Sequence, residues 1–533
     1  MTTPAGTVER WDAVVVGGGV AGLVAARELG VAGLRVLVLE ERDAPGGAVR
    51  AHTVAGLRLD AGAESFATRG GTVAALLDEL GLGSRVCAPE PGGSWVHLPS
   101  GDGPLPRTGL LGIPSDPAAD DVRRTLGAFG AWRARLDLVL PARVGARATS
   151  LGALVRARMG RRVLDRLVRP IVGGVHAAEP DDLAVDAVAP GLAAARAASG
   201  GSLARAVGRL RAAAPAGSAV LGLDGGLHVL VDALVDDLAA RGGELRLRTS
   251  VTALARDDGG HAYRVEARGR AGGSAVVTPR VVLATPAAPR LAAGLAPALD
   301  DVRLDDGALV TLVTLVLDEP ALDAAPRGTG VLVGREADDV RAKALTHATA
   351  KWAWTARAAG PGRHVVRLSY GRADEPPAPG PDAGGDTGGG PGRGGGAEVA
   401  GEPGGIRPQP GDDALAGAGA GGGGGAGVAG RRGGVRPLPG DDALVETALD
   451  DASVLLGVPL AADRLVGHAI VRWSQALPRP SAAHRDAVAA VRRAVATLPG
   501  VAVCGAWVAG NGLASVVPDA REAARALARR NSF

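Results

Sequence analysis

The chain has 533 residues, of which 46% are hydrophobic, 83 are glycine, and two, Cys87 and Cys504, are cysteine. This length allows two or three domains with a large core and excludes a small module held together by disulfides. The net charge of +3 is spread over 59 basic and 56 acidic residues without a basic block, so we do not expect nucleic-acid binding.

The N-terminus and the hydropathy pattern bear on location. The first ten residues lack the charged start and apolar core of a signal peptide, and no apolar run reaches the roughly 18 residues of a spanning helix. We therefore expect a soluble cytoplasmic protein, or one attached peripherally to the inner face of the cell membrane. The two cysteines lack the spacing of a metal site, so we expect no metal.

The first predicted elements form a βαβ unit. Residues 12–16 (DAVVV) are a continuous apolar run, which predicts a buried parallel strand. Glycine-rich residues 17–22 then open a helix that continues through LVAARELG, and RVLVLE predicts a second strand that ends at Glu40.

A glycine motif joins the strand to the helix. Gly17, Gly19 and Gly22 form GxGxxG in the strand-to-helix position that dinucleotide binding requires. The first glycine permits a tight turn, the second lets a pyrophosphate approach the backbone, and the third lets the helix pack closely on the strand. The phosphates would lie at the helix N-terminus, and Glu40 is placed to accept hydrogen bonds from a ribose.

Further along the chain, the predicted elements change in kind. Residues 122–211 are expected to be mostly helical, apolar residues at helical spacing predict a helix over 227–238, and short strands are expected around 245–251 and 280–284. Residues 376–440 are dominated by Gly, Ala, Pro and Asp, so we predict a disordered insertion there. An amphipathic helix is predicted from Asp519 to Arg530.

A longer glycine pattern separates FAD from NAD. The pair Gly46–Gly47 and the segment GLRLDAGAE at 56–64 follow Glu40. Together with GxGxxG, this pattern resembles FAD-dependent amine-oxidase and desaturase-like flavoproteins, in which these segments continue the flavin cleft. Ala48 stands where many members have an arginine, and Arg50 is the candidate to replace it.

Within that superfamily the chain resembles the porphyrinogen oxidases of haem synthesis. The resembling motifs occur in the same order over almost the full length: GAESFATR at 62–69, VAALLDELGLGSRV at 73–86, PLP at 104–106, LGIP at 111–114, RPIVGGVHAAEPDDL at 169–183, GGL at 225–227, GTGVLV at 328–333, KALTHATAKW at 343–352, RW at 472–473 and GAWVAGNGLASVVPDAREAA at 505–524. The lysine-poor composition further resembles actinobacterial members, which oxidise coproporphyrinogen III.

The resemblance implies a fold and a reaction. The fold would be α/β (α+β), with a Rossmann-like FAD-binding domain of the amine-oxidase type, a mixed-sheet substrate domain and a helical subdomain. The reaction would be a six-electron oxidation of coproporphyrinogen III to coproporphyrin III by FAD, with molecular oxygen reduced to hydrogen peroxide. The expected domain boundaries are 10–90, 218–290 and 465–533 for FAD binding, 91–111, 291–375 and 441–464 for substrate binding, 112–217 for the helical subdomain and 376–440 for the insertion.

The resemblance also implies site residues. FAD contacts carry over to Gly17, Gly19, Val20, Ala21, Gly22, Glu40, Glu41, Gly47, Ala61, Gly62, Ala63, Glu64, Val251, Trp473, Gly512, Leu513 and Ala514. Val251 is equally well read as a core valine. Because the substrate carries four propionates, cations near the resembling motifs are substrate candidates: Arg69, Arg169, Lys351 and Arg372. A specific catalytic residue is not identified. His176 is a weak candidate, and a packing role for it is favoured.

Three alternatives remain open. The substrate could instead be protoporphyrinogen IX. A hypothesis of another class is a non-catalytic flavin-binding scaffold that docks haem-pathway enzymes through the 376–440 insertion, and the enzyme itself could contact the next haem-pathway enzyme transiently. The helical segment could contact an anionic membrane surface, although a soluble subdomain that covers the substrate cleft is favoured.

Overall fold

The computed structural model describes most of the chain. The described ranges are 9–106, 109–176, 179–189, 191–213, 220–257, 259–270, 272–304, 309–371, 440–473 and 482–529. The chain divides into two units, Met1–Asp374 with Pro439–Phe533 and Glu375–Leu438. The second unit lies outside the described residues, and so does all but the last residue of the predicted insertion.

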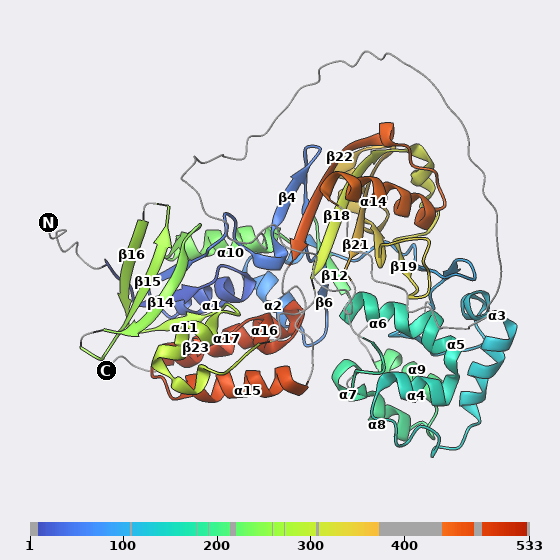
Figure 1. Cartoon of the computed structure of the whole chain (residues 1–533), viewed down its shortest axis with the longest axis horizontal. Coiled ribbons are helices and arrows are strands. Elements are labelled where there is room, and N and C mark those ends of the chain that lie inside the picture. The colour runs from blue at the N-terminus through green and yellow to red at the C-terminus, as the bar shows by residue number, and fades with distance from the viewer. Residues whose placement is uncertain are drawn as a thin grey trace, which may run out of the picture. The chain divides into compact units, whose positions relative to one another are not determined.

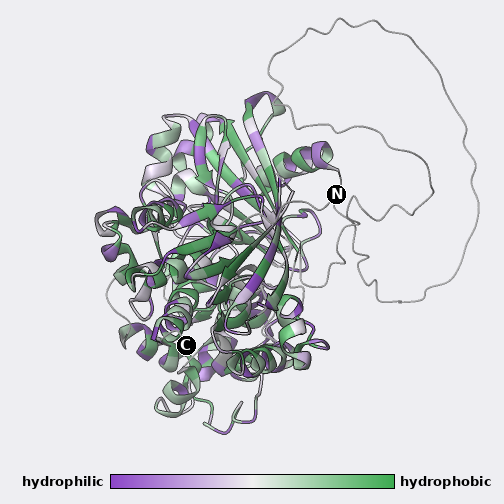
Figure 2. Cartoon of the chain, turned by 90° about the vertical axis from the view of Figure 1, so that its left-hand side faces the viewer, coloured by the Kyte–Doolittle hydropathy of each residue, from purple (hydrophilic) through white to green (hydrophobic). Residues whose placement is uncertain are grey.

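A five-stranded parallel sheet contains the predicted βαβ unit (Figure 1). Its strand order is β13-β3-β2-β17-β23, formed by Glu244–Arg246, Val36–Leu39, Ala13–Val16, Val281–Leu283 and Val501–Val503. The predicted strand at 12–16, the strand that ends near Glu40 and the strand at 280–284 are thereby confirmed. Figure 2 shows that the strands in the middle of the molecule are mostly hydrophobic. All residues of β2 and β3 are buried, as expected for a sheet that is covered on both faces.

Both faces of this sheet are covered. Helices α1 (Val20–Val31), α10 (Val229–Ala240) and α17 (Leu513–Arg529) share one core cluster with Val15 and Val38. On the other face, Val14 and Leu37 share a cluster with residues of the sheet β1-β16-β15-β14 and of α15. The bounds of these elements are Glu9–Arg10, Gly272–Thr278, Tyr263–Gly269, Ser250–Arg256 and Ala482–Ala496.

The last helix begins earlier than predicted. It starts at Leu513 rather than Asp519, and Pro518 lies inside it. Proline lacks the N–H that would bond to the carbonyl of Ala514, four residues earlier. That carbonyl instead accepts the hydroxyl of Thr72 at 3.4 Å, so the helix tolerates the proline.

A second, seven-stranded sheet is mixed. Its order is β22-β18-β21-β20-β19-β8-β9, formed by Leu465–Trp473, Val310–Asp318, Arg363–Tyr370, Ala344–His347, Gly330–Val333, Trp95–His97 and Gly103–Pro104. Helix α14 (Asp441–Leu456) packs on it, and its buried Asp451 accepts a hydrogen bond from the Tyr370 hydroxyl at 3.1 Å.

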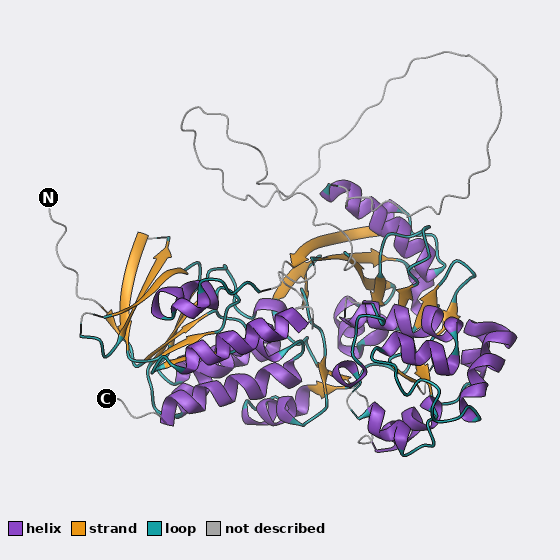
Figure 3. Cartoon of the chain, turned by 60° about the horizontal axis from the view of Figure 1, so that its bottom comes forward, coloured by secondary structure: helices purple, strands orange, loops and turns teal. Residues whose placement is uncertain are grey.

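The predicted helical segment is confirmed over 120–213, where the helices are drawn as purple coils in Figure 3. They are α3 (Asp120–Arg135), α4 (Leu151–Met159), α5 (Arg161–Val163), a π-helical turn (Leu164–Val168), α6 (Arg169–His176), α7 (Val185–Val188), α8 (Leu192–Ala197) and α9 (Leu203–Ala213). Fully buried Arg158 and Asp137 form an ion pair at 2.7 Å, and Asp137 also accepts the amides of Leu203 and Ala204 at the start of α9. This network holds α4 and α9 together.

Shorter elements connect these parts. They are the hairpin β4–β5 (Ala51–Val54, Leu57–Asp60), the small sheet β6-β12-β7 (Phe66–Ala67, Val220–Leu223, Val86–Cys87), the pair β10–β11 (Gly109–Leu110, Ile113–Pro114), and helices α2 (Thr72–Glu79), α11 (Ala288–Ala292), α12 (Ala348–Lys351), α13 (Ala353–Ala359) and α16 (Ala506–Ala509). None of the described helices has the length and apolarity that crossing a membrane requires. The proposed domain boundaries stay a prediction.

Candidate functional site

The GxGxxG turn leaves no room for side chains. Gly17 has a φ of +105°, and a Cβ atom there would lie 2.8 Å from the carbonyl oxygen of Ala284. A Cβ at Gly22 would lie 1.9 Å from the carbonyl oxygen of Gly17. These close approaches press the start of α1 against the end of β2, as the sequence predicted for the first and third glycines.

The N-terminus of α1 is open to a ligand. Gly19 is its N-cap and supplies no side-chain cap, and Val20 and Ala21 form the first helical turn. The first amides of a helix have no partner within it, so an anion is stabilised there by hydrogen bonds and by the helix dipole. This geometry fits the pyrophosphate of a dinucleotide.

The second glycine pair lies beside the first. The Gly46 amide donates to the Gly18 carbonyl oxygen at 2.8 Å, and Gly19 forms a parallel bridge with Gly46. A Cβ atom at Gly47 would lie 3.4 Å from the Cα of Gly19. Two glycine loops that are far from each other in sequence thus form one surface of bare backbone.

Glu40 connects this surface to the end of β3. It is only 8% exposed, and its carboxylate accepts the Gly18 amide at 2.7 Å and the Arg42 amide at 2.9 Å. A carboxylate has further acceptor sites, so these bonds orient Glu40 without using all of its capacity for a ribose. Its neighbour Glu41 is exposed.

The strand that follows β13 lies against Glu40. The Thr249 amide donates to the Glu40 carbonyl at 2.8 Å, and β14 begins one residue later. Val251 is 8% exposed, belongs to the core beneath the parallel sheet and precedes a shift of register in its strand pair. Its side chain is therefore a core residue, and the adenine contact through its backbone stays a prediction.

Trp473 joins the end of β22 to the 61–64 segment. Its indole N–H donates to the Ala61 carbonyl at 3.2 Å, and a Cβ at Gly62 would lie 3.1 Å from its ring. The guanidinium of Arg50 lies 4.7 Å from the ring centroid, at cation–π distance. The Ala63 amide bonds to the Ala48 carbonyl at 2.8 Å, so this segment also runs beside the second glycine loop.

Glu64 is the centre of a partly buried ion triad. One carboxylate oxygen accepts Lys351 at 2.5 Å, and the other accepts Arg367 at 2.9 Å. Burial by itself would raise the pKa of the Glu64 carboxyl, but the two cations outweigh it and hold the pKa at about 2. Glu64 is therefore ionised at neutral pH and does not act there as a proton donor.

Sequence reasoning missed Arg367. Its guanidinium also donates to the carbonyls of Asp60 at 3.2 Å and Gly62 at 2.8 Å, so it fixes the backbone of the 60–64 segment. A charged residue inside the apolar strand sequence RHVVRLSY could have drawn attention to Arg367. Its partner Glu64 could not be predicted, because the two residues are 303 positions apart in the chain.

The start of α17 also lies near the first helix. Gly512 has a φ of +98° and its carbonyl accepts the amides of Ser515 and Val516. Leu513 is buried in the core that it shares with α1, and Ala514 packs against the same core. Arg69 donates to the Ser515 hydroxyl at 3.1 Å, which places this substrate candidate beside the start of α17.

The other substrate candidates have separate surroundings. Lys351 belongs to the Glu64 triad, whereas Arg169 contacts Glu179 and lies 3.3 Å from Asp165 in the helical segment. Arg372 lies outside the described residues, and His176 ends α6 with its side chain outside them. The three substrate candidates within the described ranges, Arg69, Lys351 and Arg169, thus have different partners.

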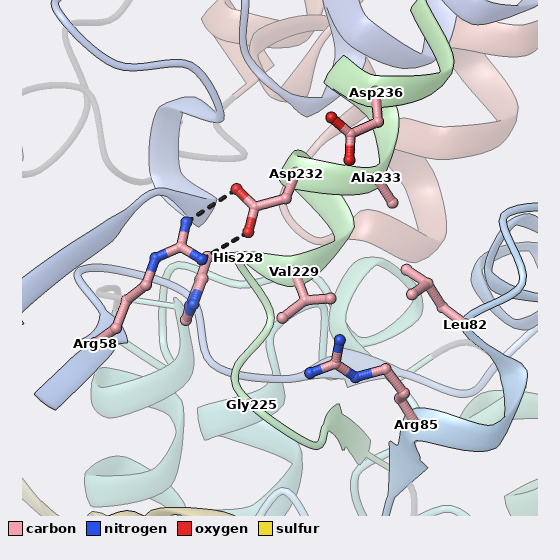
Figure 4. A pocket seen from close by; sticks show the side chains of 9 residues that line it. All are labelled: Arg58, Leu82, Arg85, Gly225, His228, Val229, Asp232, Ala233 and Asp236. Carbon is pink, nitrogen blue, oxygen red and sulfur yellow. Dashed lines mark hydrogen bonds and ion pairs between the residues drawn. The ribbon is translucent and has the colours of Figure 1, made fainter. Parts of the chain in front are cut away.

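Asp60 of the resembling segment has a structural role that sequence reasoning did not assign. Its carboxylate accepts the amides of Leu227 and His228 and faces the His228 ring nitrogen, each at 2.9 Å. These bonds tie the end of β5 to the start of α10. Beside His228 lies a cavity of about 380 Å³ (Figure 4). Arg58 and Asp232 line it and form a bidentate ion pair, with hydrogen bonds of 2.8 and 2.9 Å.

Comparisons with known proteins agree with this geometry. The family described as flavin containing amine oxidoreductase matches residues 20–376. The coproporphyrinogen III oxidase of Propionibacterium freudenreichii is 33% identical over 66% of this chain and 73% of its own length, and that of Mycobacterium bovis is 32% identical over 68% and 77%.

Solved structures agree on the fold. One of them is a crystal structure from Exiguobacterium sp. 255-15 that is provisionally named a protoporphyrinogen oxidase. The match covers 98% of this chain and 100% of that one. Its TM-score is 0.72 at 24% identity.

The cofactor follows from the family and the fit of the residues. The open N-terminus of α1, the paired glycine loops and the buried carboxylate of Glu40 suit a dinucleotide, and the family is flavin-containing, so FAD is the cofactor. The chain is an FAD-dependent oxidoreductase that belongs to the flavin-containing amine oxidoreductase family and, within it, to the porphyrinogen oxidases.

Proposed function

We propose that the protein oxidises coproporphyrinogen III to coproporphyrin III in haem biosynthesis. The observation that supports this most directly is the similarity to two coproporphyrinogen III oxidases over about two thirds of the chain. The oxidation removes six electrons and six protons from one porphyrinogen. Three molecules of oxygen accept them and leave as three molecules of hydrogen peroxide.

The FAD contacts proposed from the sequence suit this cofactor. Gly17, Gly19, Val20, Ala21 and Gly22 would hold the pyrophosphate. Glu40 would bind the ribose, with Glu41 beside it, and Val251 would meet the adenine through its backbone. The flavin end would contact Gly47, Ala61, Gly62, Ala63, Glu64, Trp473, Gly512, Leu513 and Ala514. When bound, FAD accepts the hydrogen removed from the substrate, and the protein supplies position and a shielded pocket.

The ion triad favours an anionic substrate near the 61–64 segment. Lys351 and Arg367 carry two positive charges against the single negative charge of Glu64, so the triad has a net charge of +1. Lys351 has three N–H donors, and Glu64 takes one of them. We propose that a propionate of the porphyrinogen is bound here, which makes Lys351 the strongest of the substrate candidates.

The test is a comparison of two porphyrinogens under anaerobic conditions. Each is titrated into the FAD-loaded protein while the flavin absorbance is followed, and aerobic kcat/KM values are then measured by porphyrin fluorescence and oxygen uptake. We expect coproporphyrinogen III to bleach the flavin fully and to have the higher kcat/KM. A higher kcat/KM for protoporphyrinogen IX would establish it as the substrate instead. The Exiguobacterium structure carries the provisional name of a protoporphyrinogen oxidase.

A protein that binds FAD but gives no rate above autoxidation would favour the scaffold hypothesis. Deleting residues 380–434 tests that hypothesis, because a docking segment is required for pathway flux in cells but not for FAD binding in vitro. We also propose that the active enzyme contacts the next haem-pathway enzyme transiently, and the same deletion tests this contact.

We propose a cytoplasmic location with peripheral contact to the inner face of the cell membrane. In α3, Phe129 is 65% exposed and Trp132 is 55% exposed, and their ring centroids lie 5.7 Å apart. Exposed aromatic rings beside arginines suit an anionic lipid interface. Flotation with anionic vesicles tests this contact, and the variant Phe129→Ser/Trp132→Ser should not float.

A further inference from the structure

A second cavity, of about 530 Å³, lies where the helical segment meets the seven-stranded sheet. Its walls come from α5, the π-helical turn, residues 98–100 after β8 and residues 334–336 after β19. Two acids, Asp165 and Glu336, line it, together with five arginines: Arg161, Arg162, Arg166, Arg169 and Arg335. The cavity wall thus carries a clear excess of positive charge.

Three of these arginines share their acidic partners. Asp165 lies 3.0 Å from Arg161 and 3.3 Å from Arg169. Glu179 contacts Arg169 and also Arg335, the latter at 2.5 Å. One carboxylate lies between two guanidinium groups in each case, so these three cations are neighbours. Arg169 also lies 3.8 Å from Asp181, so the three arginines are largely paired within the protein.

The other two arginines are held without being neutralised. Arg162 donates to the carbonyl of Leu126 at 3.2 Å, and Arg166 donates to the carbonyl of Thr125 at 3.1 Å. Within the described ranges no carboxylate pairs with either of them. Backbone carbonyls orient a guanidinium but leave its full charge, and the remaining N–H donors are available to a ligand.

The local backbone is also unusual. Arg166 and Asp165 lie in the π-helical turn Leu164–Val168, between α5 and α6. Such turns occur frequently at functional sites, because the extra residue changes the direction of the side chains around it. Here the turn belongs to the same wall as all four arginines of the helical segment.

From this arrangement we infer that the cavity is a binding site for a phosphate-type anion. Several guanidinium groups around one small cavity match an anion with two or more charges on a single group better than a monovalent carboxylate, and guanidinium pairs with phosphate through two parallel hydrogen bonds. The source is either a free phosphate compound or the phosphate of a lipid headgroup. The site is separate from the dinucleotide site at α1, and it does not depend on the proposed substrate.

Inorganic pyrophosphate is the probe for the free anion. The FAD-loaded protein is titrated calorimetrically at low and at moderate salt, together with the variant Arg162→Gln/Arg166→Gln. The control Arg264→Gln/Arg268→Gln removes the same charge from exposed positions of β15. We expect saturable, salt-sensitive binding in the wild type and the control, and at least about tenfold weaker binding in the cavity variant.

Flavin absorbance and melting temperature show whether each variant is folded. Should the cavity variant melt early, the single variant Arg335→Gln, in the segment after β19, replaces it. Vesicles of phosphatidylglycerol distinguish the two sources. Flotation that is lost in the cavity variant and blocked by pyrophosphate assigns the site to a headgroup, whereas pyrophosphate binding without flotation assigns it to a free phosphate compound. Equal pyrophosphate affinity in wild type, cavity variant and control, or no saturable binding, would overturn the inference.

Discussion

Gly22→Ala tests whether the close packing of α1 on β2 is required for FAD binding. The added methyl carbon would lie 1.9 Å from the Gly17 carbonyl oxygen, whereas contacts under 3.0 Å are essentially absent for real Cβ atoms. The start of α1 must therefore move away from β2 by about 1 Å, at a cost of about 1–3 kcal/mol for overpacking. The same movement displaces the amides at the start of α1 that we propose bind the pyrophosphate.

The expected loss of cofactor affinity follows from these amides. A hydrogen bond to a charged group contributes about 1.5–3 kcal/mol, so losing one of them weakens FAD binding roughly tenfold to a hundredfold. Reconstitution of the apoprotein, followed by flavin fluorescence quenching, measures the dissociation constant. Gly294→Ala is the matched control, since its Cβ would meet nothing within 4 Å. If Gly22→Ala binds FAD within about threefold of wild type and melts at the same temperature, the packing argument is refuted.

Three further changes test the ion pairs and the tryptophan contact. Glu64→Gln leaves two partly buried cations, Lys351 and Arg367, without their carboxylate, so unfolding should become easier by about 1–3 kcal/mol. Asp318→Asn, at an exposed ion pair, should leave the free energy of unfolding nearly unchanged. The pKa of Glu64 is about 2, below its ordinary 4.5, so its contribution to the free energy of unfolding is present above pH 4.5 and disappears as the pH falls towards 2. In denaturant titrations over this pH range, the free energy of unfolding should therefore vary less with pH in Glu64→Gln than in the wild type. His97, at the end of β8, contacts Asp102 at 2.6 Å and Asp339 at 3.0 Å. Burial lowers the pKa of His97, but these two carboxylates outweigh it and raise the pKa above the ordinary 6.5. The stabilisation is therefore full below pH 6.5 and is lost as the pH rises further, and His97→Gln should remove this step from melting curves. Trp473→Phe removes the bond to Ala61 and should weaken FAD binding severalfold, measured as above.

The features that the sequence predicted correctly are features of the backbone. A tight turn or a close helix–strand contact requires glycine at one position, so the requirement is visible in the local spacing, as at Gly17 and Gly22. The strand that ends at Glu40 was equally visible, because a continuous apolar run marks a buried parallel strand. Glu40 indeed lies beside this turn, with its carboxylate on the Gly18 amide.

The parts that the sequence did not predict are made by side chains that meet over long distances in the chain. Lys351 and Glu64 are 287 residues apart, and Arg58 and Asp232 are 174 residues apart. An ion pair needs only opposite charges at two positions, and a chain with 115 charged residues offers thousands of such pairs. The role of Arg169 shows the same difficulty, since its motif was recognised but its partners were not.

This division explains why family membership was easier to predict than substrate. The FAD contacts proposed here are made mostly by backbone amides and glycines, and any dinucleotide enzyme of this kind needs the same local sequence. The choice of porphyrinogen depends instead on which cations bind the propionates. Of the two candidates Lys351 and Arg169, the first contacts Glu64 and the second contacts Glu179 in the helical segment. Coproporphyrinogen has two more propionates than protoporphyrinogen. If Lys351 selects the substrate, removing its positive charge should change the ratio of kcat/KM for coproporphyrinogen to kcat/KM for protoporphyrinogen, and not lower both values equally.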